Sequence, residues 1–144
     1  MQCKGVLNLK NLMIENIAER LKEYFKDKEE ILLAFIFGSA AGGRLTKGSD
    51  VDIAVLFSDM PNFQDVLKMT TAVSEVIGRE VDMIILNNSS PVIRMQVLKN
   101  GKLIKSKDDV IYNNFYVRAV KEYDDLKHVR KEAEEKILRG RIYA

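Results

Sequence analysis

The sequence predicts an α/β (α+β) fold in which helices flank a mixed sheet of three to four strands. Two observations support this fold class. Segments with a helical period of apolar residues alternate along the chain with short, continuous apolar runs rich in β-branched and aromatic residues. No repeat, low-complexity tract or flexible linker interrupts this alternation. Because 144 residues fit one hydrophobic core, we expect a single domain over residues 1–144.

The first half of the chain predicts two helices and two strands. Apolar residues recur every four positions over Leu9–Phe25, which is typical of an amphipathic helix. The unbroken apolar run Ile31–Phe37 predicts a strand buried on both faces, and Asp50–Phe57 predicts a second strand after a glycine-rich turn. Beyond this strand, an apolar helical face over Phe63–Ile77 predicts a crossover helix.

The second half continues the alternation and ends in a long helix. The β-branched run Glu80–Leu86 predicts a third strand, which completes a β-α-β unit within one sheet. A helix is expected over Pro91–Lys99, and we interpret the short apolar stub at Leu103 and Ile104 as an edge strand. Residues from about 108 to 139 contain neither proline nor glycine and predict one long helix, which could be broken once.

The apolar positions of this last helix include three tyrosines, Tyr112, Tyr116 and Tyr123. Further apolar residues follow at helical spacing: Ala119, Leu126, Val129, Ala133 and Ile137. The pattern favours core packing of the three tyrosines, with a surface for a partner as the alternative for part of this stripe.

The composition excludes several classes of protein. Lysine and arginine total 23, aspartate and glutamate total 21, and the two signs are mixed, so we expect no stable nucleic-acid binding. The longest apolar run, Ile31–Phe37, is far shorter than the roughly 18 residues of a membrane-spanning helix, so no membrane partner is expected. The single cysteine, Cys3, excludes an internal disulfide framework and a thiolate zinc site, which favours a cytoplasmic protein.

Two carboxylates at the start of the second predicted strand indicate a metal site. Asp50 and Asp52 are two residues apart, so the pleat points both to one face while Val51 and Ile53 point to the other. Two carboxylates about 4 Å apart repel by about 4 kcal/mol at an effective dielectric constant of about 20, a cost that a bound cation offsets. All-oxygen ligands are typical of Mg²⁺ or Mn²⁺ sites.

A third carboxylate opens the next predicted strand. Asp82 lies among residues that otherwise favour burial, where a carboxylate is costly unless it is paired or binds a metal. If this strand lies beside the second, Asp82 meets Asp50 and Asp52 at one face of the sheet. Three carboxylates in that arrangement suit a two-metal site for in-line displacement at phosphorus, with Asp82 facing the attacking hydroxyl.

A phosphate-binding turn is expected where the first strand ends. Backbone N–H groups and a hydroxyl at Gly38 and Ser39 can hold phosphate oxygens, and the glycine allows close approach. The following segment offers Arg44 and Lys47, which are either cationic phosphate contacts or solvated charges of a polar loop.

These motifs together resemble a known superfamily. Gly38-Ser39, followed at this distance by Asp50-x-Asp52 and then by Asp82, resembles the nucleotidyltransferase motif of the DNA polymerase beta superfamily. Within it, the small size and the tail segments 90–93 and 96–102 resemble the minimal nucleotidyltransferases, the MntA-like antitoxins of HEPN/MNT toxin–antitoxin pairs. The resemblance covers nearly the whole chain and implies a polymerase-beta-like nucleotidyltransferase fold.

The resemblance also implies an activity and a partner. MntA-like proteins transfer AMP from the substrate ATP to a tyrosine hydroxyl of a cognate HEPN-domain ribonuclease toxin and thereby silence it. Carried over position by position, Asp50, Asp52 and Asp82 would be catalytic and would bind Mg²⁺, with two ions expected and Mn²⁺ as an alternative. Gly38 and Ser39 would bind the nucleotide phosphates.

Two other functions remain open at this point. The first is a small-molecule, antibiotic-type nucleotidyltransferase, although such relatives usually carry an added acceptor domain for which 144 residues leave little room. The second is a non-catalytic antitoxin that neutralises its partner by binding, with a vestigial metal site. Both homo- and hetero-oligomers are compatible with the sequence.

Overall fold

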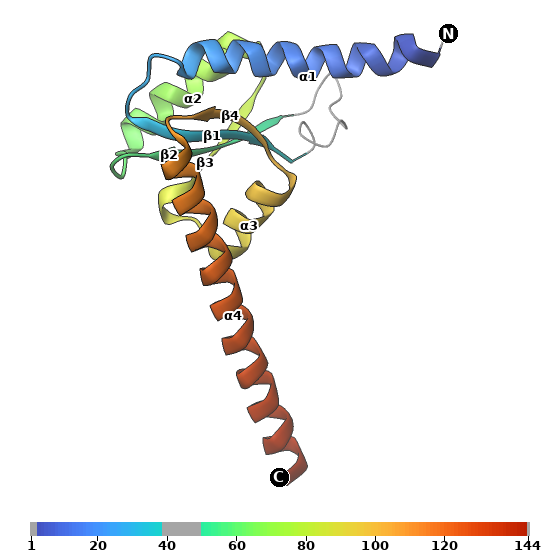
Figure 1. The fold of residues 1–144 in the computed structure, drawn as a ribbon, viewed down its shortest axis with the longest axis vertical. Helices are drawn as coiled ribbons and strands as arrows, with labels where there is room; N and C mark the ends of the chain where they lie inside the picture. Colours follow the sequence, from blue (N-terminus) through green and yellow to red (C-terminus); the bar gives the residue numbers. More distant parts are fainter. Residues whose placement is uncertain (1–2, 39–49, 144) are drawn as a thin grey trace.

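The computed structural model describes residues 3–38 and 50–143, and it describes side chains over residues 13–38 and 50–140. Four helices, four strands and one short 3₁₀ helix follow one another in this part of the chain (Figure 1). In chain order they are α1 (Cys3–Phe25), β1 (Ile31–Phe37), β2 (Val51–Phe57), α2 (Phe63–Ile77), β3 (Val81–Ile85), η1 (Leu86–Asn88), α3 (Pro91–Asn100), β4 (Lys102–Ser106) and α4 (Asp109–Tyr143).

The four strands form one mixed sheet in the order β3-β2-β1-β4. Strands β2 and β3 are parallel, because helix α2 returns the chain to the same end of the sheet, and the other two pairings are antiparallel. The apolar stub around Leu103 is the edge strand β4, paired with β1. The predicted mixed sheet and the predicted β-α-β unit are therefore confirmed.

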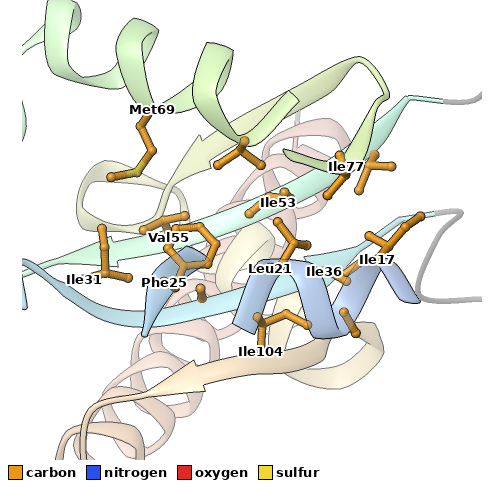
Figure 2. Close-up of a cluster of buried hydrophobic side chains, with 14 of the residues drawn as sticks. Ile17, Leu21, Phe25, Ile31, Ile36, Ile53, Val55, Met69, Ile77 and Ile104 are labelled. Carbon is orange, nitrogen blue, oxygen red and sulfur yellow. The ribbon is translucent and has the colours of Figure 1, made fainter. Parts of the chain in front are cut away.

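Helices cover both faces of the sheet (Figure 1). On one face, α1 and α2 pack through Ile17, Leu21, Phe25 and the buried side of α2 against strand residues such as Ile36 and Ile53 (Figure 2). On the other face, a second cluster of buried residues joins the sheet to η1, α3 and α4: Leu33, Phe35, Ala54, Leu86, Val97 and Phe115. Strand β1 contributes to both clusters, so its predicted burial on two faces is confirmed.

Local signals set the ends of helix α2. The side chain of Asn62 accepts a hydrogen bond from the backbone N–H of Asp65 at 2.8 Å, which satisfies one of the free donors at the start of the helix. At the other end, Gly78 adopts a left-handed φ of 68°, and its N–H donates to the Ser74 carbonyl at 2.8 Å. The helix therefore occupies the residues that its apolar face predicted.

Several element boundaries differ from the prediction by one or a few residues, and two of the differences have a clear consequence. Helix α1 begins at Cys3, before the expected start at Leu9. The third strand was expected to reach Leu86 but ends at Ile85, and the chain turns into η1. This turn follows from the side chain of Asn87, which accepts from the N–H of Phe57 and donates to its carbonyl, each at 2.9 Å. No helix of the described residues combines the length and apolar content that a membrane crossing requires.

Helix α4 departs most from the expected core packing. It runs without a break from Asp109 to Tyr143, and its first half packs on α3 and the sheet, where Phe115 and Ala119 are buried. Of the tyrosines, Tyr116 is 48% exposed, whereas the other two are half-buried. Every residue over 127–140 is exposed, and this half extends away from the rest of the chain (Figure 1). The predicted core packing is therefore wrong for Tyr116, and the apolar positions beyond Leu126 also lie outside the core.

Candidate active site

Two of the three predicted carboxylates lie side by side at the start of neighbouring strands. Asp52 is the second residue of β2, and its register partner across the parallel pairing with β3 is Asp82. A backbone hydrogen bond of 2.9 Å from the Val51 N–H to the Glu80 carbonyl fixes the two strand starts relative to each other. Asp50 immediately precedes β2 and is exposed.

The alternation of β2 explains which face carries the carboxylate. Val51 and Ile53 are fully buried in the cluster under α1 and α2, while Ala54 belongs to the cluster under α3 and α4. Because side chains alternate along a strand, Asp52 lies on the same face as Ala54. The half-buried carboxylate of Asp52 thus stands at the edge of the α3 and α4 face, as the pleat argument predicts.

The charges of the three carboxylates interact. Burial raises the pKa of the Asp52 carboxyl above its usual range, and the negative charges of Asp82 and Asp50 raise it further. Asp52 is half-buried, whereas the other two are exposed. The arrangement concentrates negative charge around one partly desolvated carboxylate. A bound cation would stabilise it by offsetting the repulsion between the carboxylates.

Gly38 closes the site from the side of β1. Phe37, the last residue of β1, is the register partner of Asp52, and the next residue, Gly38, has a left-handed φ of 73°. A Cβ atom at this position would overlap the Asp52 Oδ2 atom and stand 3.2 Å from Asp52 Cγ. Only glycine meets both requirements, the backbone angle and the space. The sequence predicted that Gly38 lets the backbone come close to a phosphate. Among the described residues, the group that lies close to Gly38 is the carboxylate of Asp52.

Several predicted residues lie outside the described part of the chain. Ser39, Arg44 and Lys47 all fall in the segment 39–49, whose structure is not described. Of the predicted site, the structure therefore brings together Gly38 and the carboxylates around Asp52.

The donor set fits a hard divalent cation. Within residues 3–38 and 50–143, no three Asp, Glu, His or Cys side chains are preassembled as a metal cage. Mg²⁺ does not need one, because it is usually held by one or two carboxylates together with waters and substrate phosphates. The carboxylates around Asp52 supply oxygen ligands only, and burial together with their mutual repulsion raises the pKa of Asp52. The residues present therefore fit Mg²⁺ or Mn²⁺ by their chemistry.

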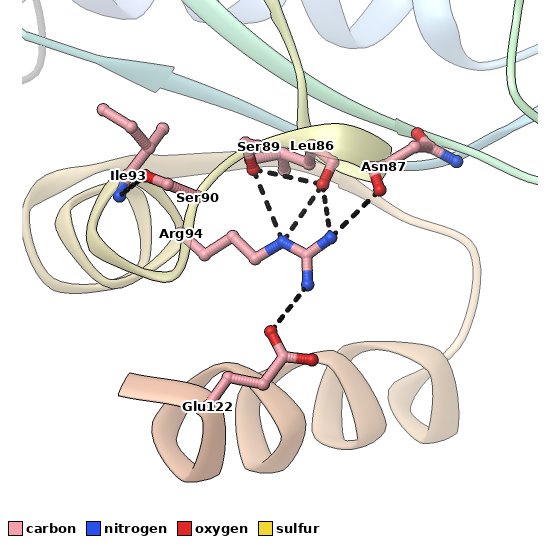
Figure 3. Close-up of polar contacts among 7 residues, drawn as sticks. All are labelled: Leu86, Asn87, Ser89, Ser90, Ile93, Arg94 and Glu122. Atoms are coloured by element: carbon pink, nitrogen blue, oxygen red, sulfur yellow. Dashed lines mark hydrogen bonds and ion pairs between the residues drawn. The ribbon is translucent and has the colours of Figure 1, made fainter. Parts of the chain in front are cut away.

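One residue that supports this face was not found by sequence reasoning. The guanidinium of Arg94, whose side chain is 13% exposed, donates to the Leu86 carbonyl at 2.8 and 3.1 Å and to the Asn87 carbonyl at 3.1 Å (Figure 3). It also forms an ion pair of 3.0 Å with Glu122 on α4. The planar guanidinium thus holds η1, helix α3 and helix α4 together. Its signal in the sequence is a lone arginine within the apolar first turns of a predicted helix.

The chain matches a family model and several named relatives. The model of the polymerase beta nucleotidyltransferases matches residues 19–110. A protein of Methanocaldococcus jannaschii that carries the provisional name protein adenylyltransferase is 30% identical over 100 residues, which are 69% of this chain and 93% of that protein. The protein adenylyltransferase MntA of Shewanella oneidensis is 28% identical over 104 residues, 71% of this chain and 73% of MntA.

Solved structures share the fold, and the family match includes the site. A chain from a crystal structure of a toxin–antitoxin with AMP-PNP has a TM-score of 0.72 at 23% identity, covering 84% of this chain and 98% of that chain. A chain from a complex of tri-AMPylated Shewanella oneidensis HEPN toxin with MNT antitoxin has a TM-score of 0.65 at 22% identity, covering 90% and 98%. The matched residues 19–110 include all four strands and all three carboxylates. This chain belongs to the polymerase beta nucleotidyltransferase family.

Proposed function

We propose that this protein is a protein adenylyltransferase that transfers AMP from ATP to a tyrosine hydroxyl of a HEPN-type toxin and thereby acts as its antitoxin. The observation that carries the proposal is the meeting of Asp52 with Asp82 and Asp50 beside Gly38 at one edge of the sheet. The names of the relatives support the choice of AMP and of a protein acceptor. The HEPN toxin complexed with MNT antitoxin supports the choice of partner.

The carboxylates would hold Mg²⁺, with Mn²⁺ as an alternative, and the metal would supply charge neutralisation at the nucleotide phosphates. Asp50 and Asp52 are the proposed principal ligands, and Asp82 completes the set. Gly38 and Ser39 bind phosphate oxygens through backbone N–H groups and the serine hydroxyl. These contacts hold the α-phosphate at the edge of the face that carries Asp52.

The proposed step is an in-line displacement at the α-phosphorus. The acceptor tyrosine oxygen forms a bond to this phosphorus, and the bond from phosphorus to the oxygen that bridges the α- and β-phosphates breaks. Pyrophosphate leaves with the electron pair of that bond. The tyrosine proton passes to the carboxylate of Asp82, which orients the hydroxyl, and then to solvent. The product is a phosphodiester between the tyrosine and AMP.

We place this reaction in the cytoplasm. The chain contains one cysteine, which suits a reducing compartment. ATP and the RNA that a ribonuclease toxin cleaves are both available there.

Intact-mass spectrometry tests the proposal directly. A HEPN-type protein from the same organism is incubated with this protein, ATP and Mg²⁺, and its mass is compared with that of the untreated protein. We expect a gain of one or more AMP units that maps to a tyrosine. The double variant Asp50→Asn/Asp52→Asn removes two negative charges from the site and should give no gain, because the displacement loses the groups that position the nucleotide. Asp59→Asn, an exposed aspartate beyond the other end of β2, is the matched control and should leave transfer unchanged.

Three outcomes would contradict the proposal. Full transfer by the double variant would remove the carboxylates from the mechanism. Suppression of the toxin without any mass gain, retained in the double variant, would instead indicate an antitoxin that acts by binding alone. If neither modification nor suppression occurs, a small hydroxyl compound becomes the acceptor to test.

A further inference from the structure

The second half of helix α4 carries an apolar stripe that nothing in the described chain covers. Leu126, Val129, Ala133 and Ile137 follow one another at spacings of three and four and lie on one side of the helix. The same side carries Phe115 and Ala119, which are buried against the rest of the chain. Past Leu126 the stripe continues into solvent, where Val129 is 63% and Ile137 is 58% exposed.

An uncovered stripe of this kind is costly for a helix. Most of the stability of helices in proteins comes from packing an amphipathic face, and isolated helices of about 12–15 residues are marginal in water. The helix continues over 127–140 with every side chain exposed, so no other part of the described chain buries this stretch. A surface that covers the stripe would stabilise it.

We propose that the second half of α4 packs antiparallel against the same segment of a second copy of this protein, with Ala133 at the two-fold axis. In this register Val129 faces Ile137 of the partner subunit, and Leu126 faces Gly140 of the partner subunit. The small residues Ala133 and Gly140 allow the two helix backbones to approach closely. This inference goes beyond the proposed adenylyl transfer and does not depend on it.

The position of the folded body selects both the direction and the register. The sheet and α3 pack on the Phe115 side of α4, which is also the side of the stripe. A parallel pairing through the stripe would place two bodies in the same space. An antiparallel pairing places the two bodies at opposite ends of the paired segment. Because Leu126 is the last half-buried residue of α4, the partner helix can overlap only the segment that follows it.

Charges that flank the stripe are complementary in this arrangement. On a helix of 3.6 residues per turn, Arg130 and Glu134 lie on one flank of the stripe, and Glu132 and Lys136 lie on the other. A two-fold axis through Ala133 brings like flanks together, so Arg130 faces Glu134 of the partner subunit, and Lys136 faces Glu132 of the partner subunit. Each pairing occurs twice by symmetry.

Sedimentation velocity over a range of protein concentrations tests the association with a matched pair of variants. Ile137→Glu places a charge in the stripe, and Leu138→Glu makes the same change at the next residue, which is equally exposed at 56% but points to another side of the helix. We expect the wild-type protein and Leu138→Glu to form a dimer. Ile137→Glu should raise the dissociation constant at least about tenfold while circular dichroism shows unchanged helix content, because a desolvated unpaired charge opposes binding.

Disulfide cross-linking tests the direction and the register. In a background with Cys3→Ser, Ala133→Cys should form a disulfide-linked dimer under mild oxidation, because the two copies of this residue meet at the axis. Val129→Cys alone should not cross-link, whereas a mixture of Val129→Cys and Ile137→Cys chains should. Leu138→Cys is the control for random collision and should form no disulfide-linked dimer.

The proposal fails if the wild-type protein stays monomeric at all concentrations and Ala133→Cys forms no more dimer than Leu138→Cys. It also fails if Ile137→Glu leaves self-association unchanged. If Ile137→Glu instead abolishes binding of the HEPN-type protein while no self-association is seen, the stripe serves a heterologous partner, and the self-pairing is refuted.

Discussion

Gly38 offers the sharpest test of how the active site is built. The substitution Gly38→Ala introduces two separate problems, because the residue has a φ of 73° and its added Cβ would overlap Asp52 Oδ2. A left-handed backbone costs roughly 1–2 kcal/mol at a residue with a side chain. Relief of the overlap moves the carboxylate of Asp52 out of its favoured rotamer, which costs about 0.5–1.5 kcal/mol more.

Gly78→Ala is a control that separates the two problems. Gly78 has a nearly identical φ of 68°, but a Cβ there has no neighbour within 4 Å. Both variants should therefore lose roughly 1–2 kcal/mol of unfolding free energy from the backbone, and Gly38→Ala should lose more. Urea unfolding followed by circular dichroism measures the difference.

Activity should separate the two variants much more strongly. Displacement of a group at the reaction centre by about 1 Å can cost about 100-fold in rate, so Gly38→Ala should lose adenylyl transfer by about that factor. Gly78→Ala, which lies beyond the end of α2, should retain it. The intact-mass assay, read as a time course, measures both rates. Equal transfer rates for the two variants would refute the argument that Gly38 makes room for the Asp52 carboxylate.

The remaining predictions concern stability. Arg94→Met removes the hydrogen bonds to the Leu86 carbonyl and the ion pair with Glu122, and should lower the unfolding free energy by about 1–3 kcal/mol, because the part-buried Leu86 carbonyl loses its donors. A loss below about 1 kcal/mol in urea unfolding would show that Arg94 does not anchor α4. Asn62→Ala removes the cap on the Asp65 N–H and should cost about 1 kcal/mol, whereas Asn62→Asp should restore most of it. Thermal unfolding of both Asn62 variants is the check, and equal midpoints would contradict the role of the cap.

Much of the site could be predicted from the sequence because its determinants are local. The spacing of Asp50 and Asp52 and the alternation of a strand decide that both carboxylates share a face. The position of Gly38 directly after an apolar run indicates a turn at the end of a strand. The assigned roles of these residues in metal binding and catalysis stay predictions.

Other features could not be predicted because they depend on distant parts of the chain. The register that pairs Asp52 with Asp82 requires β2 and β3 to be neighbours, which is decided by the crossover of α2 and the packing of both faces. In the sequence, Arg94 looks like an ordinary helix residue. Its role depends on contacts with Leu86 and Glu122, which only the folded chain places next to it. The spacing of residues within one segment does not indicate which distant segments are neighbours.

The sequence by itself determined which segments are helices and strands, because the spacing of apolar residues along the chain, every two or about every 3.6 positions, distinguishes the two. It also determined which carboxylates and which glycine make up the candidate site. The tertiary structure decided which strands are neighbours, why Gly38 must lack a side chain, and where burial of α4 ends. The apolar stripe of α4 has the same period in both halves of the helix. Only the placement of the sheet and α3 against its first half decides which part is core and which part faces solvent.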